Sequence, residues 1–185
     1  MSTNENRKLA TNEMGRLDID EFKQEAKHPI VIVLDSIRSM HNVGSAFRTG
    51  DAFLVEKVCL CGITATPPHR EIHKTALGAT ETVVWEHHHS IEDALTQLKN
   101  EGYQLLLAEQ TTQSVALQDY RFDREAKYAF VFGNEAFGVS DEALPLADAC
   151  LEIPQFGTKH SLNVSVSIGI CLWEYLAQTQ VARNS

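Results

Sequence analysis

Residues 153–166, Ile153-Pro-Gln-Phe-Gly-Thr-Lys-His-Ser-Leu-Asn-Val-Ser-Val166, join a strand-like run to a long apolar segment that we expect to be helical. Polar side chains crowd this junction within six positions: Thr158, Lys159, His160, Ser161 and Asn163. A single Ser, Thr, Asp or Asn side chain is enough to accept hydrogen bonds from the free N–H groups of a first helical turn. The surplus therefore indicates a ligand, although Thr158 or Ser161 could also serve as an ordinary helix cap.

Apolar runs alternate with helix-like segments along the rest of the chain. Strands are predicted at residues 30–34, 55–61, 81–86, 103–108, 128–132 and 150–153, and helices at 17–27, 91–100 and from 161 to about 180. The run Ile30–Leu34 is continuous and mostly β-branched, the pattern of a strand buried on both faces. This alternation is typical of an α/β domain with a mainly parallel sheet flanked by helices.

The composition is that of an ordinary globular chain. It has 185 residues, of which 43% are hydrophobic and 22% charged, and this length suits a single domain. We expect residues 1–28 to form an N-terminal arm with a short helix, and residues 29–185 to form the domain. The sequence shows no apolar run of the roughly 18 residues that a membrane helix needs, and no apolar core of a secretory signal. A cytoplasmic protein without membrane contact is therefore expected.

The net charge of −9 weighs against a general nucleic-acid binder, because phosphate contacts need Lys and Arg. A local basic face can nevertheless form on an acidic protein. The side chains that could converge on such a face are Arg38, Arg48, Arg70, Lys74 and Lys159.

No metal site is expected. The four cysteines lack Cys-x2-Cys spacing and lie in or beside apolar segments, which favours buried free thiols. The run His87–His89 places adjacent side chains on opposite faces of an extended chain. His69 and His73 have the i, i+4 spacing of helical metal ligands, but no third ligand is evident. We favour an exposed loop there, in which Arg70 and Lys74 could contact phosphates.

Three loops, at residues 36–48, 133–140 and 155–163, follow predicted strands and carry polar groups. Ligands of open parallel sheets bind beyond the carboxyl ends of the strands, so the three loops are expected at one edge.

The first loop contains Asn42-Val-Gly-Ser-Ala-Phe-Arg48, which opens a helix with an amide and places Arg48 on the face of Ser45. An Asn cap, a packed glycine and a surface arginine would explain it equally well. The second loop contains Gly133-Asn-Glu-Ala-Phe-Gly138, whose glycines suit a close ligand approach or any tight turn. Glu135 is harder to explain by packing, because a carboxylate there can orient an arginine or accept from ligand hydroxyls.

Together, these loops resemble the motifs of the SpoU-type (TrmH-like) RNA 2′-O-ribose methyltransferases of the SPOUT superfamily. The motifs are Asn-x-Gly-x-x-x-Arg at 42–48, Gly-x-Glu-x-x-Gly at 133–138, and Ile-Pro, Gly and Ser-Leu-Asn-Val-Ser within 153–165. With their flanks they span residues 30 to about 176. One departure is Gln155, where the family often has Met.

The resemblance implies that residues 29–185 form a SPOUT domain whose C-terminal portion threads an earlier loop as a deep trefoil knot, an exception among folds. It also implies S-adenosylmethionine as cofactor, RNA as substrate, and a homodimer whose site takes residues from both subunits. Because only the short arm at residues 1–28 is left for extra recognition, we favour a compact tRNA element over a large ribosomal surface. The implied cofactor-binding residues are Ala108, Gly133, Gly138, Ile153, Pro154, Gly157 and Leu162. Ala108 is placed only by its position at a strand end. For RNA contacts we expect Arg38, His41, Arg70, Lys74 and Lys159.

The implied reaction must remove a proton from a ribose 2′-hydroxyl as it attacks the methyl group in line with the departing sulfur. Arg48 corresponds to the family's catalytic arginine. Because a guanidinium stays charged up to about pH 12, we expect Arg48 to stabilise the alkoxide or pass its proton to a substrate phosphate. Asn42, Glu135, Ser161 and Asn163 would position Arg48 and the ribose.

Three alternatives stay open. A catalytically idle homologue could hold RNA or cofactor, although the presence of all five candidate catalytic residues argues against it. The substrate could be rRNA rather than tRNA. A knotted enzyme that methylates a base nitrogen would need a different set of loop residues, including an Asp base.

Overall fold

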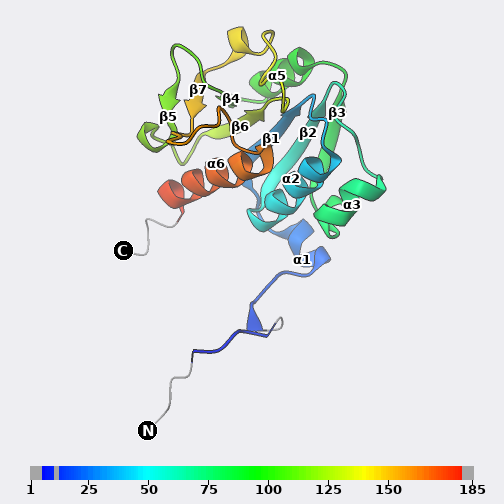
Figure 1. Ribbon diagram of the computed structural model, residues 1–185. Coiled ribbons are helices and arrows are strands. Elements are labelled where there is room, and N and C mark those ends of the chain that lie inside the picture. Colours follow the sequence, from blue (N-terminus) through cyan, green and yellow to red (C-terminus); the bar gives the residue numbers. More distant parts are fainter. Residues whose placement is uncertain (1–5, 11–12, 181–185) are drawn as a thin grey trace.

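The computed structural model describes residues 6–10 and 13–180, and its centre is a seven-stranded parallel sheet (Figure 1). The strands lie in the order β3-β2-β1-β6-β4-β7-β5. Their bounds are β1 (His28–Asp35), β2 (Val55–Cys61), β3 (Val84–His88), β4 (Tyr103–Ala108), β5 (Val115–Ala116), β6 (Lys127–Phe132) and β7 (Ala149–Glu152). The predicted α/β class with a parallel sheet is confirmed.

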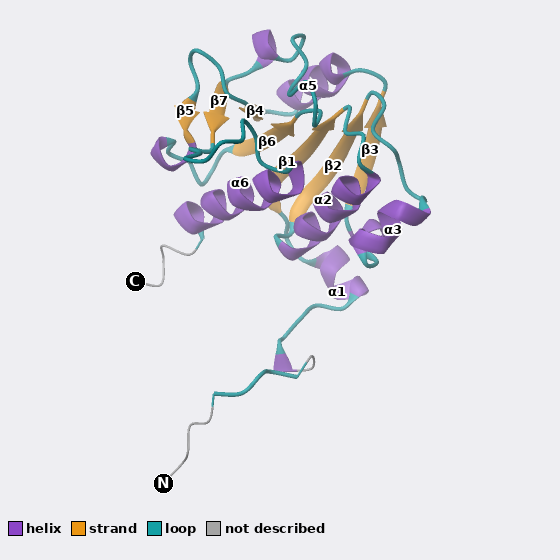
Figure 2. Ribbon diagram, in the orientation of Figure 1, coloured by secondary structure: helices purple, strands orange, loops and turns teal. Residues whose placement is uncertain are grey.

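Helices cover both faces of this sheet (Figure 2). They are α1 (Ile19–Gln24), α2 (Met40–Ala52), α3 (Arg70–Ala76), α4 (Ala79–Thr82), α5 (Ile91–Asn100) and α6 (Val164–Thr179), with 3₁₀ turns at Leu117–Asp119 and Leu144–Leu146. Two apolar clusters fill the interior. Helices α2 and α6 contribute Phe47 and Leu172 to one cluster, and α5 contributes Leu95 to the other.

Strand β1 shows why the sheet needs cover on both faces. Ile30, Ile32 and Leu34 point into the cluster of α2 and α6, whereas Val31 and Val33 point into the cluster of α5. Successive side chains of a strand alternate between faces, so the unbroken apolar run is buried on both sides, as the sequence predicts.

Several element bounds differ from the sequence-based prediction. The strand predicted at 81–86 begins at Val84, because Ala79–Thr82 form the short helix α4, whose Ala79 is buried against α2's cluster. The last strand ends at Glu152, and the first helix spans only Ile19–Gln24. Strand β5 was not predicted.

Two differences affect the predicted site. Helix α6 begins at Val164 rather than at residue 161, since Asn163 is its N-cap and accepts a hydrogen bond from the Ser165 N–H. The segment expected to be an RNA-facing loop is largely helix α3, which His69 caps by accepting from the Glu71 N–H. The predicted free cysteines are confirmed, with three of the four buried.

The order of the strands inserts the C-terminal strand β7 between two earlier strands. Strand β7 lies between β4 and β5, both of which precede it in the chain. Helix α6 then runs across the face shared with α2 (Figure 2). Within residues 6–10 and 13–180, none of the helices has the length and apolar character needed to cross a membrane.

Candidate functional site

The loops that follow β1, β6 and β7 converge at one edge of the sheet, as predicted. The Asn134 side-chain amide donates to the Ser36 carbonyl oxygen over 2.7 Å, which joins the second loop to the first. The Asn163 amide donates to Asn42 Oδ1 over 3.2 Å, which joins the third loop to α2. Segments more than 90 residues apart in sequence are thus held together by side-chain hydrogen bonds.

Glu135 connects the second loop to the start of α2. Its carboxylate accepts hydrogen bonds from the backbone N–H groups of Arg38 and Ser39, each over 3.1 Å, and from the Asn42 amide over 3.0 Å. Partial burial raises the pKa of Glu135, but these hydrogen bonds outweigh it and hold the pKa below its ordinary value. A negative charge is also favourable at a helix N-terminus, so Glu135 is an ionised acceptor at this site.

Asn42 lies at the centre of this network and is buried. Its amide nitrogen donates to Glu135 while its amide oxygen accepts from Asn163. The helix cap is Ser39, whose hydroxyl accepts from the Asn42 N–H over 3.3 Å. The simple alternative of an Asn cap is therefore wrong, because Asn42 sits one turn inside α2 and links the other two loops.

The two glycines of the second loop are required by the loop itself. A Cβ on Gly133 would lie 2.1 Å from the Gly138 carbonyl carbon, and Gly138 has a φ of +74°. Asn134 and Gly138 exchange two backbone hydrogen bonds of 2.8 Å across this turn. The tight turn is reason enough for a glycine at 133, because its bare face meets the backbone of its own loop; the expectation that Gly133 also lets a ligand approach closely stays a prediction.

Glu109 was missed by the sequence analysis. Its carboxylate accepts from the Val139 N–H over 2.9 Å and lies where a side chain on Gly138 would project. It follows Ala108 at the end of β4, so the signal that singled out Glu135, a carboxylate at a strand terminus, could have identified it.

A cavity of about 550 Å³ opens between these loops. It is lined at the ends of β4, β6 and β7 by Ala108, Gly133, Gly138 and Ile153, and from the third loop by Ser161, Leu162 and Asn163. Glu109, Glu135, Gln155 and His160 also line it. Pro154 and Gly157 do not line it, although the other predicted cofactor-binding residues do, as do Ile153 and Gln155 on either side of Pro154.

Arg48 lies outside this cavity. It is exposed on α2 and lines a second hollow of about 490 Å³ together with Arg16 and Asp51. Six residues of α-helix separate it from Asn42, which is about 9 Å along the axis at roughly 1.5 Å per residue. Within one chain, the predicted catalytic arginine is therefore not assembled with Glu135 and Asn163.

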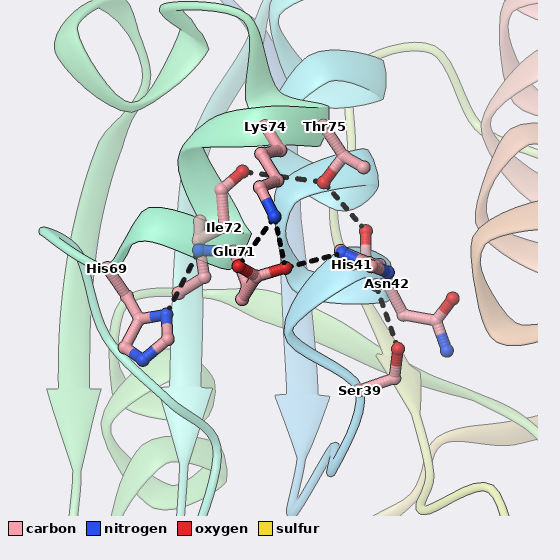
Figure 3. Close-up of polar contacts among 8 residues, drawn as sticks. All are labelled: Ser39, His41, Asn42, His69, Glu71, Ile72, Lys74 and Thr75. Atoms are coloured by element: carbon pink, nitrogen blue, oxygen red, sulfur yellow. Dashed lines mark hydrogen bonds and ion pairs between the residues drawn. The ribbon is translucent and has the colours of Figure 1, made fainter.

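The predicted RNA-binding residues fall into two groups. His41 and Lys74 share the Glu71 carboxylate, at 3.1 Å and 2.7 Å, where α2 packs on α3 (Figure 3). The Lys74 ammonium and then the His41 ring lower the pKa of Glu71. Arg38, Arg70 and Lys159 are exposed, with no ion pair within the described residues.

The contact between α2 and α3 is close enough to fix this arrangement. A Cβ on Gly44 would lie 2.3 Å from the Ile72 carbonyl oxygen, and the Thr75 hydroxyl donates to the His41 carbonyl oxygen over 3.0 Å (Figure 3). The glycine of the first motif thus allows the two helices to touch.

Solved structures share this fold. A TrmH/SpoU tRNA modifying enzyme from A. aeolicus superposes with a TM-score of 0.76 at 26% identity, covering 86% of this chain and 81% of that one. An AdoMet-bound rRNA methyltransferase from Sinorhizobium meliloti gives a TM-score of 0.74 at 27% identity, covering 86% and 59%. The fold and the loops at the site together place this chain in the class of TrmH/SpoU proteins.

Sequence comparison gives the family. Residues 29–173 match the SpoU rRNA Methylase family. A tRNA (guanosine(18)-2′-O)-methyltransferase of Thermus thermophilus is 32% identical over 88% of this chain and 81% of its own length. The 23S rRNA (guanosine-2′-O-)-methyltransferase RlmB of Vibrio cholerae is 28% identical over 92% and 68%. The chain belongs to the SpoU rRNA Methylase family.

Proposed function

We propose that this protein transfers a methyl group from S-adenosylmethionine to a ribose 2′-hydroxyl of RNA. The observation that carries the proposal is the network of Glu135, Asn42 and Asn163, which locks the three motif loops around one cavity. The relatives named above are RNA 2′-O-methyltransferases, and an AdoMet-bound methyltransferase shares the fold.

The cavity suits the cofactor in size and chemistry. Its volume of about 550 Å³ lies within the range of roughly 300–1,000 Å³ typical of small-molecule sites. Backbone at the strand ends and the side chains of Ile153 and Leu162 would hold the adenosine part. When bound, the sulfonium supplies an electrophilic methyl group. We keep Pro154 and Gly157 in the proposed pocket only as backbone that shapes the loop around Gln155.

Positioning and charge stabilisation are the work of the protein's own side chains. Glu135 and Asn42 hold the loops, and Ser161 and Asn163 face the cavity in which the ribose would lie. Arg48 is the proposed stabiliser of the alkoxide that forms as the 2′-hydroxyl loses its proton, because a guanidinium keeps its charge and its fixed donors at neutral pH.

We propose that the active form is a homodimer, which would account for the distance between Arg48 and the cavity. Helix α6 exposes Val166 and Trp173, which are 49% and 54% accessible and lie about two turns apart on one face of the helix. Exposed apolar side chains along one helix face favour a protein contact. Co-expression of an Arg48→Ala chain with an Asn163→Ala chain tests the shared site. Partial activity of the mixed dimer, with both single dimers inactive, is expected; an inactive mixed dimer would place the whole site in one subunit.

The proposed topology of the C-terminal part is the trefoil knot. Its support is the return of β7 between β4 and β5 and the contact of α6 with the earlier loop at residues 117–126. There the Gln178 amide donates to the Tyr120 carbonyl oxygen over 3.0 Å, and the Phe122 ring lies 5.5 Å from that of Tyr175. Residues 29–185 would form this domain, preceded by the arm.

Transfer RNA is the proposed substrate, and the cytoplasm the proposed location. Relatives from Thermus thermophilus and Escherichia coli that are named as tRNA methyltransferases are 32% and 31% identical, against 28% for the rRNA enzyme. Incubation with methyl-labelled S-adenosylmethionine and separate tRNA and rRNA fractions tests this choice. We expect label in tRNA, mapped to one ribose; label in rRNA alone would redirect the proposal, and no label in either would favour the idle homologue.

A further inference from the structure

Three side chains that commonly bind metals meet on the sheet face that packs against α5. They are Cys59 of β2 and Glu86 and His88 of β3, and their ligand atoms all lie within 4.8 Å of one another. Parallel pairing aligns Cys59 with Glu86 and Cys61 with His88, and residues two apart on a strand share a face. None of the three lines the cavity described above.

One nitrogen atom of this cluster lacks a hydrogen-bond partner within the described residues. His88 Nε2 is buried, and no described residue makes a hydrogen bond to it. Glu86 Oε2 lies 3.4 Å from it without making a hydrogen bond, and the His88 side chain as a whole is only 12% exposed. Buried polar atoms in proteins are nearly always satisfied, so an exception of this kind calls for a missing partner.

We propose that Cys59, Glu86 and His88 bind one divalent transition-metal cation, with Zn²⁺ the best match. Sulfur, imidazole nitrogen and carboxylate oxygen are the three ligand types that Zn²⁺ takes in proteins. Softer sulfur and imidazole ligands together disfavour Mg²⁺ and Ca²⁺, which take oxygen ligands. Three protein ligands leave one tetrahedral position for water, which can approach from the side of Glu86, 37% of whose side chain is exposed.

The charges around the cluster agree with a divalent ion. The Lys57 ammonium lies 3.1 Å from Glu86 Oε1 and 3.2 Å from Glu101 Oε2. A cation that binds Cys59 releases the thiol proton. The two glutamates and the sulfur then carry three negative charges and Lys57 one positive charge, which leaves two for the cation to neutralise. The Glu86 oxygen nearer to His88 is Oε2, so one carboxylate can contact Lys57 and the cation at the same time.

The position of the ligands gives the ion a structural task. Strand β3 is the edge of the sheet and pairs only with β2. A cation bound by Cys59 on one strand and by Glu86 and His88 on the other would fasten this edge strand. The sequence alone predicted no metal site, because the ligands meet only through the register of two strands.

Cobalt substitution in the untagged, full-length protein tests the proposal. After treatment with a chelator, titration with Co²⁺ should produce a sulfur-to-cobalt charge-transfer band. Zn²⁺ should then displace the Co²⁺, abolish the band and raise the Tm of the protein. His88→Gln and Cys59→Ser should each weaken Zn²⁺ affinity by more than the roughly 10- to 100-fold typical of outer-shell changes. His87→Gln and Cys171→Ser, which alter a histidine and a buried cysteine outside the cluster, should bind like the unaltered protein.

Two results would overturn the inference. One is the absence of a cobalt band and of any Zn²⁺-dependent rise in Tm in the unaltered protein. The other is an unchanged affinity in His88→Gln, which should disturb the fold less than Cys59→Ser because the His88 side chain is 12% exposed whereas Cys59 is fully buried. Circular dichroism of each variant without metal verifies folding, and methyl transfer is a separate readout, so failure here leaves the proposed function untouched.

Discussion

The two ends of α2 differ in how fully their polar groups are used. At the N-terminal end, the Asn42 side chain is buried, and both its amide nitrogen and its amide oxygen are hydrogen-bonded. Toward the other end, Arg48 is exposed and makes no hydrogen bond or ion pair within the described part of the chain. One motif thus combines a residue that fixes the loops with a residue that is free to meet a ligand.

This difference separates stability from chemistry along a single helix. Holding catalytic geometry requires side chains that are already paired before substrate binds, which describes the network at Asn42. A group that stabilises developing charge must instead point to the place where the charge appears. A guanidinium already paired with a carboxylate of its own chain could not do so. Substitution of Arg48 should therefore lower activity alone, whereas substitution of Asn42 should lower stability together with activity.

Arg48→Ala should show the largest effect, on activity alone. Loss of one charge-stabilising donor costs about 100- to 1,000-fold in kcat, and the exposed position predicts an unchanged Tm. The kcat of Arg48→Lys should lie between those of Arg48→Ala and the unaltered enzyme, because a lysine keeps the charge but not the planar donors. Arg121→Ala, which removes another exposed arginine, is the control. Activity of Arg48→Ala close to that of the unaltered enzyme would exclude Arg48 from the reaction.

Gly133→Ala should act through the fold. A Cβ there would meet the Gly138 backbone at 2.1 Å, so the loop must shift, at a cost of about 1–3 kcal/mol in unfolding free energy. Cofactor affinity should fall with it, since the same loop lines the cavity. Gly157→Ala is the matched control, because no atom lies within 4 Å of its added Cβ. Equal stability of the two variants in denaturant titrations would contradict the tight turn described for Gly133.

Asn42→Ala should lower stability less than Gly133→Ala does, and it should also lower activity. It removes hydrogen bonds to Glu135 and Asn163, which water can partly replace because both partners are exposed. We expect a loss of about 0.5–1.5 kcal/mol, with a fall in kcat because the third loop is no longer tied to α2. Ser45→Ala, on the same helix, is the control. If thermal unfolding and kcat both stay unchanged, the network has no role in positioning.

The sequence predicted the convergence of the three loops because it follows from strand alternation and from the rule for parallel sheets. The buried run of β1 was also predictable, because its apolar pattern lies within one short segment of the sequence. The partners within the site were not predictable in this way. The sequence left Asn42 open between a helix cap and a residue that positions the site, and only its hydrogen bonds to Glu135 and Asn163 show that it links the loops.

Errors occurred where tertiary contacts override local preference. Residues 81–83 include Thr82 and Val83, which favour strands, yet packing of Ala79 and Val83 into the core places α4 before β3. The Ser161 hydroxyl was an adequate cap by composition, but Asn163 takes that position in α6. The register of β2 and β3, which brings Cys59 near His88, has no signature in either strand alone.

Glu135→Gln should have the smallest effect and the clearest pH dependence. Hydrogen bonds hold the pKa of Glu135 below its ordinary value despite its partial burial, so the folded carboxylate binds its proton less readily than the unfolded one. Its contribution to stability is therefore present above the unfolded pKa, about 4.3, and disappears as the pH falls through the lower folded pKa.

At neutral pH the variant should lose about 0.3–1 kcal/mol, the usual value of a charge at an exposed helix N-terminus. Unfolding free energies of the two proteins should approach each other as the pH is lowered below the unfolded pKa. Glutamine keeps one acceptor oxygen, which can serve the Ser39 N–H and the Asn42 amide that share Oε1, whereas the Arg38 N–H, which donates to Oε2, loses its acceptor. The part of the difference that varies with pH therefore measures the charge. A gap that stays constant through this acid range would show that the carboxylate's charge does not stabilise the start of α2, and that Glu135 joins the loops by hydrogen bonding alone.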